Sequence, residues 1–257
     1  MISIKTPAQI QEMAEGGKIL AAILRKLSDA AQSGNVTTRD LDVLAKDLTL
    51  ESNAMPAFLG YRVGGNTFPA SLCVSINDEV VHGIPSDRML QPGDVVGLDM
   101  GIIYKGWYSD SAVTIEIKGS SLQEKNTVAK KLIHVTKEAM MLGIAQAQPG
   151  NHVGDIGHAV QKYVEQQGFG VVRDLVGHGI GRQLHEEPHV PNFGKRGTGP
   201  ELKAGMVICI EPMITVGDFQ VKLSSDHWTY TTKDGSLSAH FEHTVAITKE
   251  GPVVLTQ

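Results

Sequence analysis

The chain has 257 residues, of which 41% are hydrophobic, and its 23 Lys and Arg against 28 Asp and Glu give a formal charge of −5. This length can bury a sizeable core, and the composition excludes disordered, collagen-like and coiled-coil chains. The mild acidity argues against a protein that coats nucleic acid. Cys73 and Cys209 are the two cysteines, too few for a disulfide scaffold or a cysteine-rich zinc site.

The sequence also bears on location and domain organisation. No apolar run approaches the ~20 residues that a membrane-spanning helix needs, and the first residues lack the apolar stretch of a signal peptide. We therefore expect a cytoplasmic protein. No linker rich in Pro, Gly or Ser divides the sequence, so we expect residues 1–257 to form a single domain.

Two helices are predicted near the N-terminus from capping signals and apolar spacing. The first begins after Thr6, where Gln9 completes a capping box and Pro7 suits the first helical position. It is expected to stop near Gly34. The second begins at about Thr38, with leucines along one face.

Two more helices are predicted in the second half of the chain. The third opens with a capping box at Ser121 and Glu124, and Pro149-Gly150 closes it. The fourth carries an apolar face from Val153 onwards and ends at Gly168.

Apolar segments rich in β-branched residues predict the strands. They lie at 70–76, 94–103, 107–117, 206–215 and 239–248. Two helices followed by strands therefore occur twice, which suggests a duplication in which each half is an α+β unit.

Asp99 and Asp110 lie equidistant from a predicted hairpin turn near Lys105-Gly106. We therefore expect the two carboxylates to face each other across the hairpin. Adjacent carboxylates repel unless a proton or a cation separates them, and both stand among apolar neighbours. A metal site is the favoured interpretation, and hydrogen-bonded scaffolding is the alternative.

Three further candidate ligands come later in the chain: His178 among glycines, Glu211 before Pro212, and Glu242 inside an apolar segment. Four carboxylates and one imidazole suit Mn, Fe, Co or Zn, and the absence of cysteine ligands argues against structural zinc. Four negative charges favour two divalent ions over one.

Other histidines are less clear from sequence. His82 precedes Gly83, and His185 follows His178 by seven residues. Each has a catalytic interpretation, although an isolated histidine is more often a surface or core residue. His240 and His243 remain ambiguous, and His243 is expected to point away from Glu242.

These residues resemble the methionine aminopeptidases, in their shorter type I form, along nearly the whole chain. The motifs that carry the resemblance are 81–85 (VHGIP), the Asp99–Asp110 hairpin, 177–182 (GHGIGR), 185–188 (HEEP), 210–213 (IEPM) and 242–244 (EHT). The resemblance implies a pita-bread α/β fold. Its pseudo-twofold, duplicated α-β halves share a central, curved antiparallel sheet covered by helices.

The same resemblance implies two divalent metal ions (Co, Mn, Fe, Zn or Ni) and a metal-bridging hydroxide as the nucleophile. The implied ligands are Asp99, Asp110, His178, Glu211 and Glu242, with Asp110 and Glu242 bridging the ions. Asp99 completes one site, and His178 with Glu211 completes the other. Glu211 would also shuttle a proton, His185 would polarise the scissile carbonyl, and His82 would bind the scissile amide.

A methionine-sized pocket is implied as well, although its aromatic residues have an alternative interpretation as core. The implied substrate-binding residues are Phe58, Tyr61, Phe68, Cys73, His82, Leu184, His185 and Trp228. Gly64-Gly65-Asn66 departs from the family pattern as an apparent insertion, and Phe58 and Leu184 are unusual at their positions. A monovalent-cation site near Asn77 and Ser238 is a further implication.

The resemblance thus implies an enzyme that removes N-terminal methionine from nascent chains and favours a small second residue. Nascent N-termini are the expected partners, with contact to the ribosome, a monomeric state, and no membrane or specific nucleic-acid binding. One alternative is another pita-bread hydrolase, acting on Xaa-Pro peptides or creatine. Such relatives usually carry an extra N-terminal domain, whereas only 98 residues precede Asp99 in this sequence. A non-catalytic binding module of the same fold is the other alternative.

Overall fold

The computed structural model of the chain describes residues 2–119 and 127–257. The helices are α1 (Pro7–Ala31), α2 (Thr38–Glu51), α3 (Thr127–Gln146) and α4 (Val153–Gln166). The strands of the first half are β1 (Met55–Pro56), β2 (Arg62–Val63), β3 (Asn66–Thr67), β4 (Cys73–Ile76), β5 (Glu79–Val81), β6 (Val95–Tyr104) and β7 (Trp107–Glu116). Those of the second half are β8 (Gly170–Val171), β9 (Gly177–Gly179), β10 (Glu186–Val190), β11 (Val207–Ile210), β12 (Met213–Thr215), β13 (Val221–Leu223), β14 (Tyr230–Thr232), β15 (Ser238–His240), β16 (Glu242–Thr248) and β17 (Gly251–Val254).

Local sequence signals account for the helix starts. The Thr6 hydroxyl accepts a hydrogen bond from the backbone N–H of Gln9, whose side chain accepts one from the N–H of Thr6, so the predicted capping box is confirmed. Thr37 and Asp40 form a second capping box at the start of α2. The predicted start of the third helix, at residues 121–124, lies outside the described residues.

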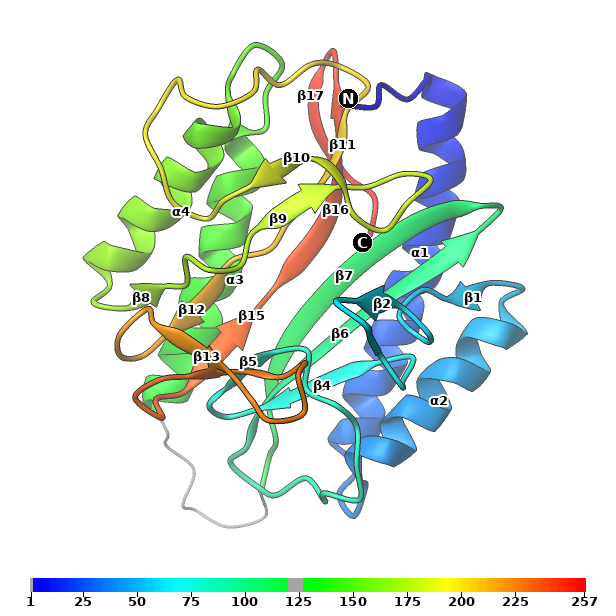
Figure 1. Cartoon of the computed structure of the whole chain (residues 1–257), viewed down its shortest axis with the longest axis vertical. Coiled ribbons are helices and arrows are strands. Elements are labelled where there is room, and N and C mark those ends of the chain that lie inside the picture. The colour runs from blue at the N-terminus through cyan, green and yellow to red at the C-terminus, as the bar shows by residue number, and fades with distance from the viewer. Residues whose placement is uncertain (1, 120–126) are drawn as a thin grey trace.

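An antiparallel sheet joins the two halves of the chain. Its main path runs β1-β6-β7-β16-β11-β9-β10, with β4 paired to β6 and β17 to β16. In the view of Figure 1, α1 and α2 lie to the right of the central strands, and α3 and α4 lie to the left. The halves meet where Glu242 of β16 pairs with Ala112 of β7 and His243 with Ser111. Across the described ranges, no helix is both long and apolar enough to cross a membrane.

Several strands are shorter than the sequence suggests. The segment predicted from residue 70 is a strand from Cys73 onwards, because the N–H groups of Ser71 and Leu72 donate to Asp42 Oδ1 of α2 instead of to the sheet. Residues 206–215 divide into β11 and β12 around Glu211-Pro212, because proline lacks the N–H that a ladder requires. Residues 239–248 divide into β15 and β16 at Phe241.

The register of the β6–β7 hairpin corrects one expectation. Asp99 pairs with Ala112, and Asp110 pairs with Gly101, so the two aspartates are diagonal neighbours and do not lie directly opposite each other. The reason is the position of the turn: Tyr104 pairs with Trp107, which centres the hairpin one residue later than equidistance requires. Because the offset along each strand is two residues, both carboxylates still project from the same face.

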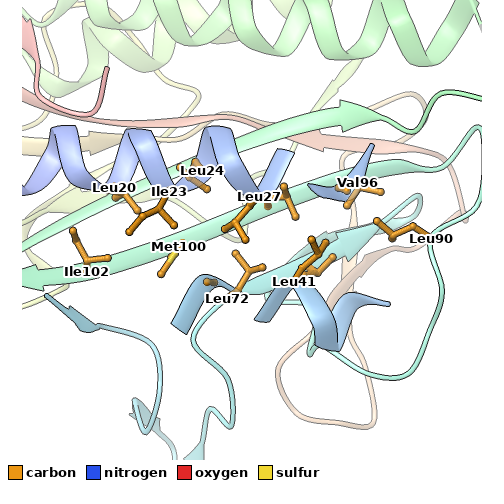
Figure 2. Close-up of a cluster of buried hydrophobic side chains, with 14 of the residues drawn as sticks. Leu20, Ile23, Leu24, Leu27, Leu41, Leu72, Leu90, Val96, Met100 and Ile102 are labelled. Carbon is orange, nitrogen blue, oxygen red and sulfur yellow. The ribbon is translucent and has the colours of Figure 1, made fainter. Parts of the chain in front are cut away.

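The core of the first half explains which face that is. Leu20, Leu24 and Leu27 of α1 are buried against Met100 and Ile102 of β6, as Figure 2 shows. Successive residues of a strand point to opposite faces, so β6 turns its even-numbered side chains to the helices. Asp99 is therefore turned to the face of the sheet that the helices leave open.

Candidate metal centre

Five strands or strand ends bring the predicted metal ligands together. Asp99 is on β6, Asp110 on β7 and His178 on β9, while Glu211 directly follows β11 and Glu242 begins β16. All five side chains line one cavity. Residues separated by up to 143 positions in sequence thus meet on the open face of the sheet.

Sheet register produces much of this convergence. Cys73, Asp99, Ala112 and Glu242 occupy one row across β4, β6, β7 and β16, so their side chains share a face. Thr244 ties the row to Asp110: its hydroxyl donates to the Asp110 carbonyl at 2.7 Å and accepts from the Asp110 N–H at 3.0 Å.

The buried carboxylates lack the partners that their burial demands. Asp99, Asp110 and Glu242 are 8%, 4% and 2% exposed, and one oxygen of each has no hydrogen-bond partner among the described residues. Their ligand oxygens lie within 4.8 Å of one another. Burial raises the pKa of Asp110 to about 7, and burial together with the neighbouring carboxylates raises the pKa values of Asp99, Glu211 and Glu242 well above the usual range. Such a cluster fits divalent cations, which would supply the missing partners.

His178 is oriented as a ligand by its own backbone neighbour. Its Nδ1 lies 2.9 Å from the carbonyl oxygen of Gly179, an acceptor, so the ring proton resides on Nδ1 and Nε2 keeps a free lone pair. Nε2 in turn lies 3.5 Å from Oε1 of Glu211. Burial lowers the pKa of His178 to about 3, which keeps the imidazole neutral and able to bind metal.

The glycines on either side of His178 are required by the close approach of the neighbouring strands. A Cβ on Gly177 would stand 2.3 Å from the carbonyl oxygen of Cys209, and one on Gly179 would stand 2.2 Å from that of Glu187. No side chain fits at either position, because β9 is pressed between β11 and β10. Glycine is thus what allows His178 to sit this close to the centre of the sheet.

Two further histidines flank the cluster. The His185 ring lies 4.3 Å from that of His178, and its Nδ1 is hydrogen-bonded to the Tyr61 hydroxyl. His82 follows β5 with a φ of 61°, and its ring is hydrogen-bonded to the backbone of Trp228. Burial, with a contribution from His185, lowers the pKa of His82 to about 4. Both rings are therefore neutral near pH 7.

The same cavity, about 120 Å³ in volume as a whole, has an apolar wall beside the cluster. Phe68 makes edge-on contacts with Phe58 and Trp228, at ring centroid distances of 6.4 and 5.2 Å. The predicted substrate-binding residues all line the cavity: Phe58, Tyr61, Phe68, Cys73, His82, Leu184, His185 and Trp228.

The apparent insertion at residues 64–66 leaves Phe68 in the pocket wall. Gly64 and Gly65 have φ values of 55° and 90° and form the turn between β2 and β3. That two-residue turn needs positive φ at both positions, which glycine adopts without strain. The hairpin also brings Val63, which no sequence motif marks, to the lining of the cavity.

The structure adds two residues beside the ligands, each two positions before a predicted one. Nε2 of His240 lies 3.6 Å from Oε2 of Glu211 and has no hydrogen-bond partner among the described residues. The ligand atoms of Cys209, His178 and Glu242 lie within 4.8 Å of one another. A period of two along a strand would have indicated both, whereas His243 points away to Thr256.

Comparisons with known proteins agree with this geometry. The model of metallopeptidase family M24 matches residues 11–249. The chain is 51% identical over 257 residues to the methionine aminopeptidase of Clostridium acetobutylicum, covering 100% of this chain and 99% of that protein. It superimposes on the crystal structure of methionine aminopeptidase from Rickettsia prowazekii with a TM-score of 0.93 at 43% identity, covering 100% of both chains.

More distant structures share the fold alone. The prolidase from Pyrococcus horikoshii is 21% identical with a TM-score of 0.76, and the match covers 99% of this chain but 63% of that one. The expected pita-bread architecture, with its curved antiparallel sheet, is confirmed by these likenesses. The chain therefore belongs to metallopeptidase family M24 and, within that family, to the methionine aminopeptidases.

Proposed function

We propose that this protein is a metal-dependent aminopeptidase that removes the N-terminal methionine of nascent proteins and peptides. One observation carries the proposal: an acidic cluster that can hold metal ions and an apolar pocket share a single cavity. A peptide with a cationic α-amine and an apolar first side chain complements both parts. Ligands come from both halves of the chain, so residues 1–257 act as one catalytic domain.

The cluster offers more than one kind of donor atom to a metal ion. Asp99, Asp110 and Glu242 supply oxygen alone, while His178 and Glu211 add a nitrogen and a further carboxylate. We propose that these five residues hold two divalent ions, with Asp110 and Glu242 between them. When bound, such a pair lowers the pKa of water towards neutrality and supplies the hydrolytic nucleophile.

The remaining polar residues handle protons and charge. Glu211 is mostly buried with a raised pKa, which suits a carboxylate that takes a proton and passes it to the leaving amine. We propose that the Tyr61 hydroxyl donates to Nδ1 of His185, which leaves the Nε2 proton to stabilise charge on the scissile carbonyl oxygen. His82 also lines the cavity, where it binds the scissile amide.

Pocket chemistry supports methionine as the first residue. Thioether sulfur is polarizable and packs well against aromatic edges, such as those of Phe68 and Trp228. Cys73 pairs with Asp99 in the register, so a side chain seated beside Cys73 brings its α-amine next to the Asp99 carboxylate. That attraction selects a free N-terminus over an internal peptide bond.

Methionine release from paired peptides tests the proposal. Metal-free protein is reloaded with Mn²⁺ or Co²⁺ and given Met-Ala-Ser and Met-Lys-Ser, with Ala-Pro-Ser as a control for Xaa-Pro cleavage. We expect release of methionine from Met-Ala-Ser in preference to the lysine peptide, and no cleavage of the third. No release with any divalent ion would refute the function, and cleavage of Ala-Pro-Ser alone would replace it. Metal analysis of anaerobically purified protein identifies the ions.

A monovalent-cation site is a second part of the proposal. The Ser238 hydroxyl lies 3.2 Å from the carbonyl oxygen of Asn77 and 3.0 Å from that of Glu79, so several oxygens converge there. Asn77 has a φ of 61°, which turns its carbonyl towards Ser238. We expect K⁺ or Na⁺ to raise the thermal midpoint, and a Ser238→Val variant to lose this dependence.

The cellular setting completes the proposal. Nascent polypeptide N-termini are the partners, which the enzyme meets at the ribosome as a cytoplasmic monomer. Support comes from the open face of the cavity, which a flexible chain end can enter. Sedimentation with and without translating ribosomes measures both the contact and the monomeric state.

A further inference from the structure

A buried thiol stands inside the metal cluster. Cys209 is fully buried on β11, and its register partner Thr244 lies two residues from Glu242 on the same face of β16. The Cys209 sulfur, a Glu242 carboxylate oxygen and a His178 ring nitrogen all lie within 4.8 Å of one another. Cys209 therefore belongs to the ring of donor atoms around the cavity floor.

Two neighbours of this thiol are themselves short of partners. Oε1 of Glu242 is buried and has no hydrogen-bond partner among the described residues. Nε2 of His178 keeps its lone pair, because Nδ1 donates to the carbonyl of Gly179. The Cys209 thiol is hydrogen-bonded to the Glu242 carboxylate and lies 3.7 Å from the Thr244 hydroxyl. Sulfur, nitrogen and carboxylate oxygen thus converge, and a cation bound there would replace the thiol proton between sulfur and carboxylate.

We propose that Cys209, His178 and Glu242 form a soft-cation subsite within the metal centre, which takes Zn²⁺ or Cd²⁺. On binding, the S–H proton leaves to solvent and the thiolate sulfur donates an electron pair to the ion. Thiolate and imidazole favour such ions, whereas the all-oxygen set of Asp99, Asp110 and Glu242 favours harder ones.

The subsite has a consequence for the proposed enzyme, on whose function this step rests. Glu242 belongs to both donor sets. An ion drawn to the sulfur takes Glu242 from the oxygen cluster, while His178 stays 3.5 Å from Glu211. A soft cation at Cys209 therefore inhibits the enzyme by drawing Glu242 away from Asp99 and Asp110.

Cobalt spectroscopy tests the subsite without reference to activity. Co²⁺ bound to a thiolate gives an intense near-ultraviolet charge-transfer band, which nitrogen and oxygen ligands do not give. We expect this band in Co²⁺-loaded wild type and in C73S, the matched variant of the other buried cysteine beside the cavity. We expect its loss in C209S and C209A, with weakening of Cd²⁺ binding by about 10–100-fold.

Each alternative result decides against the proposal. Wild type that binds Co²⁺ without the band has no sulfur ligand, and a band lost in C73S but kept in C209S assigns the sulfur to Cys73. If both Cys209 variants fail to fold, the ¹¹³Cd chemical shift of the wild-type protein still separates sulfur ligation from ligation by nitrogen and oxygen alone. Methionine release with Mn²⁺ is measured in parallel, so a protein active with Mn²⁺ but lacking the band keeps its function and loses the subsite.

Discussion

The two halves of the chain, residues 2–119 and 127–257, build the same centre by different means. The N-terminal half supplies Asp99 and Asp110 from one continuous hairpin, in which ten residues pair with ten. The C-terminal half supplies His178, Glu211 and Glu242 from a three-residue strand and from two points where strands are interrupted. Regular strand pairing thus suffices to place the two ligands of the N-terminal half. The ligands of the C-terminal half are placed by glycine, by proline and by interruptions of the strands.

The chemistry differs in the same way. To the clustered donor atoms the N-terminal half contributes carboxylate oxygens, and the C-terminal half contributes imidazole, carboxylate and a thiol. Three-residue and four-residue strands can turn different side chains into one cavity, but they hold fewer ladder hydrogen bonds. The hairpin thus brings two carboxylates to one face of the sheet, while the interrupted strands add donor groups of different kinds.

The largest expected effect comes from removing a shared carboxylate in either half. Asp110→Ala and Glu242→Ala should each lower methionine release by more than the ~100-fold that loss of a supporting residue costs, because each lies between the proposed ions. Turnover and bound metal are measured together. Asp87→Ala, an exposed carboxylate paired with Arg39, is the control and should retain both. Normal metal content in either variant would mean that the carboxylate removed from that half does not hold an ion.

The next effect is on the pH dependence of the free energy of unfolding of the metal-free protein, to which Asp110 of the hairpin contributes. The pKa of Asp110 is raised from 3.8 to about 7 in the folded state, so the native protein keeps a proton that the unfolded chain has lost. Its stabilising contribution is full below about pH 4 and disappears as the pH rises to about 7. Asp110→Asn removes this dependence, so the variant should gain several kcal/mol on wild type across that interval.

Urea unfolding of chelator-treated protein at a series of pH values measures this gain. The buried histidines, whose pKa values are lowered, act in the opposite direction in both proteins and cancel in the difference. Saturating Mn²⁺ should reverse the order of the two proteins. A difference that does not change with pH would mean that Asp110 is not the group that holds the proton.

The next largest effect on activity is expected from a hydrogen bond between the two halves. Tyr61 of the first half is hydrogen-bonded to His185 of the second, so Tyr61→Phe keeps the pocket wall but frees the imidazole. We expect kcat to fall about tenfold with little change in KM, the upper range for one hydrogen bond. Phe68→Leu, a pocket change without a hydrogen bond, should instead raise KM. Equal effects on KM in both variants would leave Tyr61 with a packing role alone.

The smallest effect is expected at His240, within the second half. Its Nε2 lies 3.6 Å from Glu211, near enough to steer that carboxylate without binding substrate. His240→Leu should lower kcat about threefold, and His240→Gln should restore most of the loss because an amide N–H can replace the ring N–H. Steady-state kinetics on Met-Ala-Ser measure both. Failure of glutamine to rescue the leucine defect would assign His240 to core packing.

Much of the centre was predictable from sequence because its parts are locally encoded. The capping box at Thr6, the hairpin turn at Lys105-Gly106 and the proline break after Glu211 each follow from short-range chemistry. The resemblance then indicated thirteen site residues, all of which line one cavity. Their roles as ligands, catalysts and pocket walls stay predictions for the variants above.

Long-range pairing decided what the sequence left open. The aspartates of the hairpin are diagonal because the turn is centred one residue later than their numbering suggests. His240 and Cys209 each stand two positions before a predicted ligand, a period that marks a shared strand face, but only β-sheet pairing sets each beside a carboxylate from another segment. The sequence by itself determined which donor types are present and on which strands. Only the tertiary structure decided which donors meet, since contacts between strands depend on register, which is settled when the whole sheet assembles.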